Sequence, residues 1–171
     1  FYPGLTGGEA LAQLLFGEAA PAGRLPVSLP DHVGQLPVYY NYKDSYRGMD
    51  YYDARERPRY SFGSGLTYTT FAYRLLEAPV DAKAENVEAL SLRIAVTNTG
   101  HRAASAVPQL YLHRTQGVVT SRIRALCDFQ KLLLAPGETR TVSLTISREA
   151  LSQWDSQMRQ QVLPGKIQWF L

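Results

Sequence analysis

The chain is poor in the residues that disulfides, metal sites and membrane spans require. Its 171 residues include one cysteine, Cys127, so an intrachain disulfide and a cysteine-based metal site are both excluded. Its three histidines are isolated from one another, and no zinc-binding spacing occurs. No run of about 18 apolar residues is present, so we expect no transmembrane helix. The sequence predicts a protein without a metal ion or other cofactor.

Charge of either sign is also scarce. The formal net charge is +3 and the isoelectric point is near 9.0, a weakly basic balance. Nucleic-acid partners and membrane surfaces select much stronger basic patches, so we expect neither as a partner. A lone thiol is stable in reducing and oxidising compartments alike, which leaves the cytoplasm, the periplasm and secretion open.

One helix is predicted near the start of the chain. Thr6 and Glu9 have the spacing of a capping box, in which each side chain accepts the other residue's backbone N–H. Apolar residues then follow at helical spacing, and Gly17 is placed to end the helix in the left-handed conformation. These apolar residues are Ala10, Leu11, Leu14 and Leu15. Since one short helix is unstable alone, we expect residues 1–30 to be the remnant of a domain that lies upstream.

Residues 31–65 read as an extended linker rich in tyrosine and arginine. Nine of the eleven tyrosines fall between Tyr39 and Tyr73, and the stretch lacks any helical or strand periodicity. Tyrosine offers an apolar face with a polar tip, which suits a half-buried seam between domains. Stacking on sugars or on bases is the alternative. The candidates for packing between domains are Tyr39, Tyr40, Tyr46, Tyr51, Tyr52 and Phe62.

A turn and a strand-like run, residues 60–71 (YSFGSGLTYTTF), join this linker to the rest of the chain. Gly63 and Gly65 allow the backbone to turn and to approach other segments closely. After them the apolar period becomes two, as in Leu92, Ile94 and Val96, with turn residues at regular intervals. We therefore predict that residues 66–171 form a mainly β, antiparallel sandwich of the immunoglobulin or fibronectin type III kind.

Further local signals support this sandwich. Val142, Leu144 and Ile146 alternate with polar residues, and Ser147 is placed to cap a single helical turn. Pro108 lacks an N–H group, so it should lie at an edge, a strand start or a bulge. We interpret Cys127 as a residue of the core because it lies within an apolar run.

Residues that could catalyse a reaction are not brought together by any local motif. Asp50, Asp53 and Glu56 are the nearest approach to the paired carboxylates of a glycosidase, but arginines lie among them. The glycines at positions 63 and 65 are too few for a phosphate-binding loop, and no helix follows them. No catalytic residue is predicted, and the residues that bind substrate stay unknown.

A series of short segments does point to one family. The segments are residues 3–12, 15–18, 21–27, 51–53, 62–71, 96–100, 109–111, 134–138 and 154–155. In this order they resemble glycoside hydrolase family 3, the group of β-glucosidases and β-xylosidases. The first three resemble the end of that family's α/β domain, and the next two its passage into the C-terminal domain. The last four resemble its fibronectin type III-like domain. The chain departs from the pattern at Pro108 and at Cys127 and Asp128.

The resemblance implies a retaining glycosidase that acts on β-linked glucosides or oligosaccharides. In that family the nucleophile is an aspartate of an upstream barrel, and the acid/base residue also precedes the segment matched here. We therefore expect this chain to be an inactive C-terminal fragment of such an enzyme, with the upstream catalytic domains as its partners. Its abrupt start at Phe1 and its end within an apolar run agree with a fragment. The alternative is a stand-alone carbohydrate-binding or adhesion module.

Overall fold

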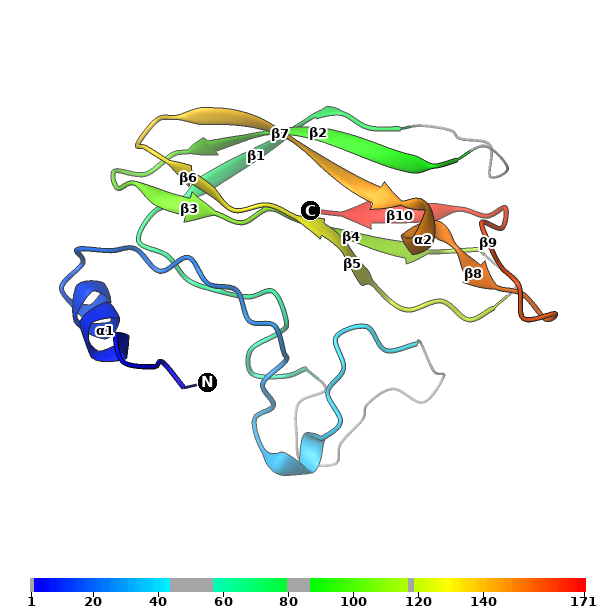
Figure 1. Ribbon diagram of the computed structural model, residues 1–171, viewed down its shortest axis with the longest axis horizontal. Helices are drawn as coiled ribbons and strands as arrows, with labels where there is room; N and C mark the ends of the chain where they lie inside the picture. Colours follow the sequence, from blue (N-terminus) through cyan, green and yellow to red (C-terminus); the bar gives the residue numbers. More distant parts are fainter. Residues whose placement is uncertain (1, 44–56, 80–86, 117–118) are drawn as a thin grey trace.

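Two antiparallel sheets of three strands form the body of the computed structural model, which describes residues 2–43, 57–79, 87–116 and 119–171 (Figure 1). In the first sheet the strand order is β1–β2–β7. Its strands are β1 (Phe71–Glu77), β2 (Ala89–Asn98) and β7 (Thr139–Ser147). In the second sheet the order is β10–β4–β5. Its strands are β4 (Gln109–Arg114), β5 (Ala125–Phe129) and β10 (Ile167–Phe170). The predicted mainly β, antiparallel sandwich is confirmed.

Smaller elements close the sandwich at its ends. Strands β3 (Ala104–Ala106) and β6 (Leu132–Leu134) pair with each other, as do β8 (Gln153–Trp154) and β9 (Gln160–Gln161). One helical turn, α2 (Arg148–Leu151), follows β7, and the Ser147 hydroxyl accepts the Ala150 N–H at its start, as predicted.

The core lies between the two sheets and follows the alternation seen in the sequence. Ile94 on β2 is opposite Val142 on β7, and Leu92 is opposite Leu144. Leu110 on β4 faces them from the second sheet and is fully buried. Cys127 is half-buried and packs against this core, which agrees with its interpretation as a core residue. Because these side chains bury completely, the sandwich has its own hydrophobic core.

Pro108 comes directly before β4, where a missing N–H breaks no ladder bond. The pairing of β4 with β5 shifts register between Leu110 and Tyr111, close to this proline. Asp128, the other departure from the family pattern, accepts the Thr145 N–H of β7 at 2.8 Å. Both departures are therefore accommodated within β4, β5 and β7.

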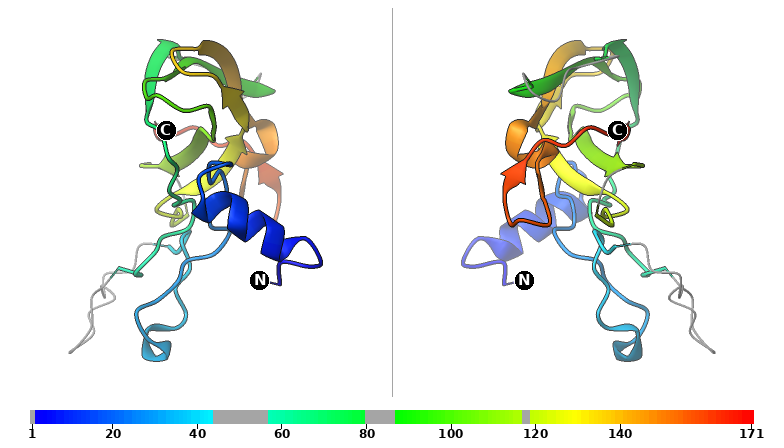
Figure 2. Two further views of the ribbon diagram at one scale, coloured as in Figure 1. Left: turned by 90° about the vertical axis from the view of Figure 1, so that its left-hand side faces the viewer. Right: turned by 90° about the vertical axis from the view of Figure 1, so that its right-hand side faces the viewer.

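The first part of the chain forms an arm outside the sandwich (Figures 1 and 2). It contains α1 (Gly7–Leu15) and a single 3-10 turn, η1 (Val33–Gln35), whose N-cap is the His32 ring. Gly17 has φ +74°, so the predicted left-handed end of the helix is confirmed. No helix in the part of the chain that the structure describes is long and apolar enough to cross a membrane.

The predicted capping box of α1 was wrong. Thr6 has φ −89° and ψ 5°, and its side chain makes no capping hydrogen bond. An N-cap hydroxyl reaches the next turn from an extended conformation, which Thr6 does not adopt. Instead, Gly4 has φ +71° and its carbonyl accepts the Gly7 N–H, so a backbone turn leads into the helix.

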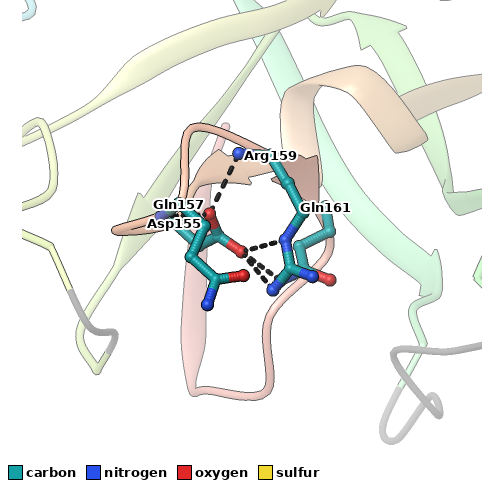
Figure 3. Close-up of polar contacts among 4 residues, drawn as sticks. All are labelled: Asp155, Gln157, Arg159 and Gln161. Atoms are coloured by element: carbon teal, nitrogen blue, oxygen red, sulfur yellow. Dashed lines mark hydrogen bonds and ion pairs between the residues drawn. The ribbon is translucent and has the colours of Figure 1, made fainter.

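A tight turn between β8 and β9 is organised around one carboxylate (Figure 3). Asp155 accepts the backbone N–H groups of Gln157 and Arg159 at 2.8 and 2.9 Å. Its second oxygen accepts from the Arg159 guanidinium and from the Gln161 amide. These bonds lower the pKa of Asp155, chiefly through the Arg159 N–H. The carboxylate therefore holds the hairpin together.

Candidate functional site

Two extended segments of the arm run antiparallel and carry the tyrosine-rich region to the sandwich. Leu29 and Tyr60 exchange backbone hydrogen bonds of 2.8 and 3.2 Å. Further along, the Gly63 N–H donates to the Leu25 carbonyl at 2.7 Å. The Ser28 hydroxyl accepts the Phe62 N–H at 3.2 Å. Residues 25–29 thus pair with the segment that leads into β1.

An aromatic cluster fills the junction between this arm and β4. The rings of Tyr40 and Phe62 stack with centroids 3.9 Å apart and an interplanar angle of 10°. Tyr111 meets both rings edge-on, at centroid distances of 6.4 and 6.5 Å. The Tyr40 hydroxyl also accepts the Leu126 N–H of β5 at 3.3 Å. Aromatic pairs of this geometry contribute about 1 kcal/mol each beyond the area they bury.

Gly63 is held against this cluster by Gln109 and Tyr111. The Gln109 amide donates to the Gly63 carbonyl at 3.0 Å and accepts the Tyr111 hydroxyl at 2.5 Å. Gly63 has φ +79°, and a Cβ on it would lie 2.4 Å from both the Gln109 Oε1 and the Tyr111 Oη. A Cβ on Gly65 would lie 2.4 Å from the Gly23 carbonyl oxygen. The prediction that these glycines serve chain direction and close packing is confirmed.

Beside the cluster a cleft of about 730 Å³ opens between the arm and the second sheet. Its aromatic lining includes Tyr40, Tyr42, Phe62, Tyr73 and Tyr111. Arg24 and Arg57 line it from the arm, and Arg124 lines it from the segment before β5. Its walls therefore combine flat apolar faces with fixed positive charge.

Two phenols of the cleft, Tyr73 and Tyr111, have a pKa that burial raises. Burial raises the pKa of Tyr73, and Arg24 beside it lowers that pKa in part. Burial likewise raises the pKa of Tyr111, the neighbouring Tyr40 adds to the rise, and Arg124 opposes it. Both phenols are neutral hydrogen-bonding groups at neutral pH, so neither neutralises an arginine.

In the described part of the chain, the hydrogen bonds between helix α1 and the sandwich lie at the C-terminal end of the helix. The Tyr68 hydroxyl donates to the Leu14 carbonyl at 2.7 Å, and the Arg102 guanidinium donates to the Gly17 carbonyl at 2.7 Å. No residue of α1 is buried. Leu15 is 73 % exposed and Phe16 is 83 % exposed. The helix therefore presents its apolar residues to solvent from a fixed anchor.

The residues predicted to pack between domains have different environments. Tyr40 and Phe62 stack on each other against β4, whereas Tyr39 is 67 % exposed. Tyr46, Tyr51 and Tyr52 lie outside the described residues. The three carboxylates weighed as a glycosidase pair, Asp50, Asp53 and Glu56, lie outside them too. Packing of the six aromatic residues between domains stays a prediction.

Sequence reasoning missed the roles of three residues, two at the junction and one in the core of the sandwich. Gln109 and Tyr111 were singled out only as part of the segment 109–111 that resembles the family, and their partners in the arm, Gly63 and Phe62, are 46 and 49 residues away. Asn98 belongs to the segment 96–100 that resembles the family, and its side chain is fully buried and bonds four backbone or side-chain groups. An amide next to a turn glycine carries no signal of such burial.

Comparison with known proteins places these features in a family. Residues 1–68 match the glycosyl hydrolase family 3 C-terminal domain, and residues 106–170 match the fibronectin type III-like domain. A periplasmic β-glucosidase from Salmonella typhimurium is 38 % identical over all of this chain. The chain belongs to glycoside hydrolase family 3.

Other relatives of this family 3 chain agree. A xylan 1,4-β-xylosidase from Xylanibacter ruminicola is 36 % identical over 98 % of the chain. The crystal structure of a β-glucosidase from Listeria innocua in complex with glucose superimposes with a TM-score of 0.92, at 29 % identity over 99 % of the chain.

The family 3 chain is much shorter than these proteins. It spans 24 % of the Salmonella protein, 19 % of the Xylanibacter protein and 25 % of the Listeria chain. It corresponds to their C-terminal part, which includes the fibronectin type III-like domain. This extent is consistent with a non-catalytic piece of a glycosidase.

Proposed function

We propose that this chain is the non-catalytic C-terminal part of a retaining, β-glucosidase-like enzyme and that it supports the catalytic domains upstream. Residues 1–30 complete an α/β domain, and residues 66–171 form the supporting sandwich. Residues 31–65 are the linker that joins these two parts. The substrate of the whole enzyme would be a β-linked glucoside or oligosaccharide, bound through the upstream domains. Three relatives support this choice because they are named β-glucosidase or β-xylosidase.

The observation that carries the proposal is the exposed apolar surface of α1 and the residues before it. Tyr2, Leu5, Leu11, Leu15 and Phe16 are all exposed, although the C-terminal end of the helix is fixed to the sandwich. A helix that is anchored and yet buries none of its apolar residues has a binding face without a partner. The partner that we propose is an upstream α/β domain, because the relatives are much longer than this chain and extend upstream of it.

A paired substitution tests this support. Changing Leu11 and Leu15 to serine should leave the free energy of unfolding of the 171-residue chain nearly unchanged, because both side chains already face solvent. In the full-length parent enzyme the same change should cost about 3 kcal/mol, since two leucines lose apolar burial. Leu133→Ser on β6, also exposed, is the control and should alter neither protein by a comparable amount.

Activity measurements complete the test. The 171-residue chain should not hydrolyse an aryl β-glucoside, whereas the parent enzyme should. Turnover by a contaminant-free sample of the chain alone would contradict the proposal. Equal unfolding free energies of the parent with and without the two serines would contradict the docking role. Titration with neutral glucans tests the alternative, since micromolar binding by the chain alone would favour a stand-alone carbohydrate-binding module.

The compartment is a further part of the proposal. The Salmonella relative is named periplasmic, which supports a periplasmic or extracellular location for the parent enzyme. Cell fractionation with an antibody against the sandwich would test it, because a signal only in the cytoplasmic fraction would contradict an exported enzyme.

A further inference from the structure

The cleft beside the aromatic cluster has features that a supporting domain does not require. Its volume of about 730 Å³ falls within the range of small-molecule sites, roughly 300–1,000 Å³. Tyr40, Phe62 and Tyr111 are held in place by stacking and by hydrogen bonds from β4 and β5. The walls are therefore already arranged before any ligand enters, which lowers the entropic cost of binding.

Within the described part of the chain, the positive charge in the cleft has no acidic counterpart. Among the residues that the structure describes, no aspartate or glutamate lines it. The Arg24 guanidinium makes one bond, from Nη1 to the Gly65 carbonyl at 2.5 Å. Arg124 lies over the Phe170 ring, 5.4 Å from its centroid, and its guanidinium has no hydrogen-bond or ion-pair partner in the described chain. Most of the N–H donors of the two arginines remain available to an anion.

Neutral polar groups accompany this charge. The cleft is also lined by Ser28, Ser61 and the Tyr73 phenol, which can exchange hydrogen bonds with hydroxyl groups. The flat face of Tyr42 adds apolar surface. A ligand that fits must combine a ring with an apolar face, several hydroxyl groups and a negative charge. A pyranose that carries a carboxylate has all three.

We propose that this cleft binds an acidic saccharide, a short oligosaccharide with a uronic acid unit whose carboxylate is held by Arg24 and Arg124. The pyranose ring lies against the aromatic wall, and its hydroxyl groups face the serines. The choice of a saccharide over other anions rests on the proposed membership in a glycosidase, whereas the selection of an anion rests on the arginines that line the cleft, to which Arg57 belongs as well. This binding goes beyond support of the upstream domains and requires no bond to be broken.

Titration calorimetry tests the proposal with trigalacturonic acid as the probe and cellotriose as the neutral control. The chain should bind trigalacturonic acid and bind cellotriose at least about tenfold more weakly, the factor expected for one lost charge-assisted hydrogen bond. Added salt should weaken the binding of the acid because its carboxylates interact with open, solvent-accessible arginines. Equal affinity for both sugars would overturn the proposal.

A matched pair of variants locates the site. Arg124→Gln should weaken the binding of trigalacturonic acid about tenfold. Arg74→Gln, at an exposed arginine of β1 that does not line the cleft, should leave the affinity unchanged. Urea unfolding of both variants shows whether each is folded. If Arg124→Gln were unfolded, Arg124→Lys would replace it and should bind more weakly than the parent chain. Equal affinities of the folded variants would place the sugar elsewhere and overturn the proposal.

Two further results would also overturn it. An oligoglutamate peptide that binds as tightly as the sugar would show that the cleft receives an acidic protein segment. Binding by the chain that is lost in the full-length parent enzyme would show that the cleft is an interface between domains. Neither result would affect the docking of α1, which the leucine-to-serine pair measures separately, so the two proposals fail independently.

Discussion

Replacing Asn98 with alanine removes a buried side chain that makes four hydrogen bonds within the sandwich. Its Oδ1 accepts the Thr69 hydroxyl at 2.7 Å and the Gly100 N–H at 3.1 Å. Its Nδ2 donates to the carbonyls of Arg102 and Leu134 at 2.7 and 3.0 Å. The residue thereby joins the end of β2 to the segment before β1, to the following turn and to β6. Alanine would satisfy none of these groups.

The expected cost follows from these four bonds. A neutral hydrogen bond contributes about 1 kcal/mol net, and a buried group left without its partner costs a further 1–3 kcal/mol or so. The two carbonyls retain other neighbours and relax in part, so we expect the free energy of unfolding to fall by about 3 kcal/mol. Urea unfolding followed by circular dichroism would measure it. The loss is a large share of the stability of a domain, which is typically about 5–15 kcal/mol.

Thr97→Ala is the adjacent control. The Thr97 hydroxyl bonds that of Thr139 at 2.7 Å on the exposed face, a cross-strand pair worth less than about 1 kcal/mol. Thr69→Ala should cost about 1 kcal/mol alone and much less when Asn98 is already alanine, because the two side chains share one bond. If Asn98→Ala cost no more than Thr97→Ala, the four bonds would not stabilise the fold and the reasoning would be refuted.

Three other predictions concern single residues. Gly63→Ala should destabilise the chain by about 1–3 kcal/mol, measured by urea unfolding, because φ +79° disfavours a side chain and the added Cβ meets Gln109. Burial raises the pKa of Cys127 to about 11, so its reaction with iodoacetamide should be slow at neutral pH and rise until near that pH. Because the unfolded thiol ionises first, stability should fall as pH rises above the ordinary value of 9.0, and Cys127→Ser should make that fall shallower; the raised pKa values of Tyr73 and Tyr111 account for the part that remains. The lowered pKa of Asp155 has the opposite sign: its contribution is present at neutral pH and should be lost as pH falls below the ordinary value of 3.8. Hydrogen exchange of the Arg159 backbone amide would measure this loss. In acid, that amide should exchange faster in the parent chain than in an Asp155→Asn variant treated alike. Protection of the amide that does not depend on pH would contradict the prediction.

The β-sandwich could be predicted because its signals are local. Val142, Leu144 and Ile146 alternate with polar residues, and the side chains of a strand alternate between faces in the same period. Ser147 and Gly17 mark the start and the end of helices through their own conformations, so they too are visible without neighbours. Periodicity and turn chemistry therefore suffice where one residue's environment is set by those next to it.

The junction could not be predicted because its partners are distant in sequence. Tyr40 stacks on Phe62 and meets Tyr111 only after β4 and the arm come together, and tyrosine composition alone does not name the partners. The Thr6 capping box failed for a related reason, since two glycines allow a backbone turn that the sequence pattern does not distinguish from a cap. Composition thus indicated a seam but not which side chains form it.

The anchoring of α1 has a consequence for protein engineering. The Leu14 and Gly17 carbonyls are bonded by Tyr68 and Arg102, side chains that belong to the sandwich side of the chain. A chimera that exchanges sandwiches between related enzymes at residue 66 would separate these donors from their acceptors. The transplanted unit should therefore begin before α1, or else carry tyrosine and arginine at the two donor positions. The boundary that a domain exchange should respect lies at these hydrogen bonds, well before the first strand.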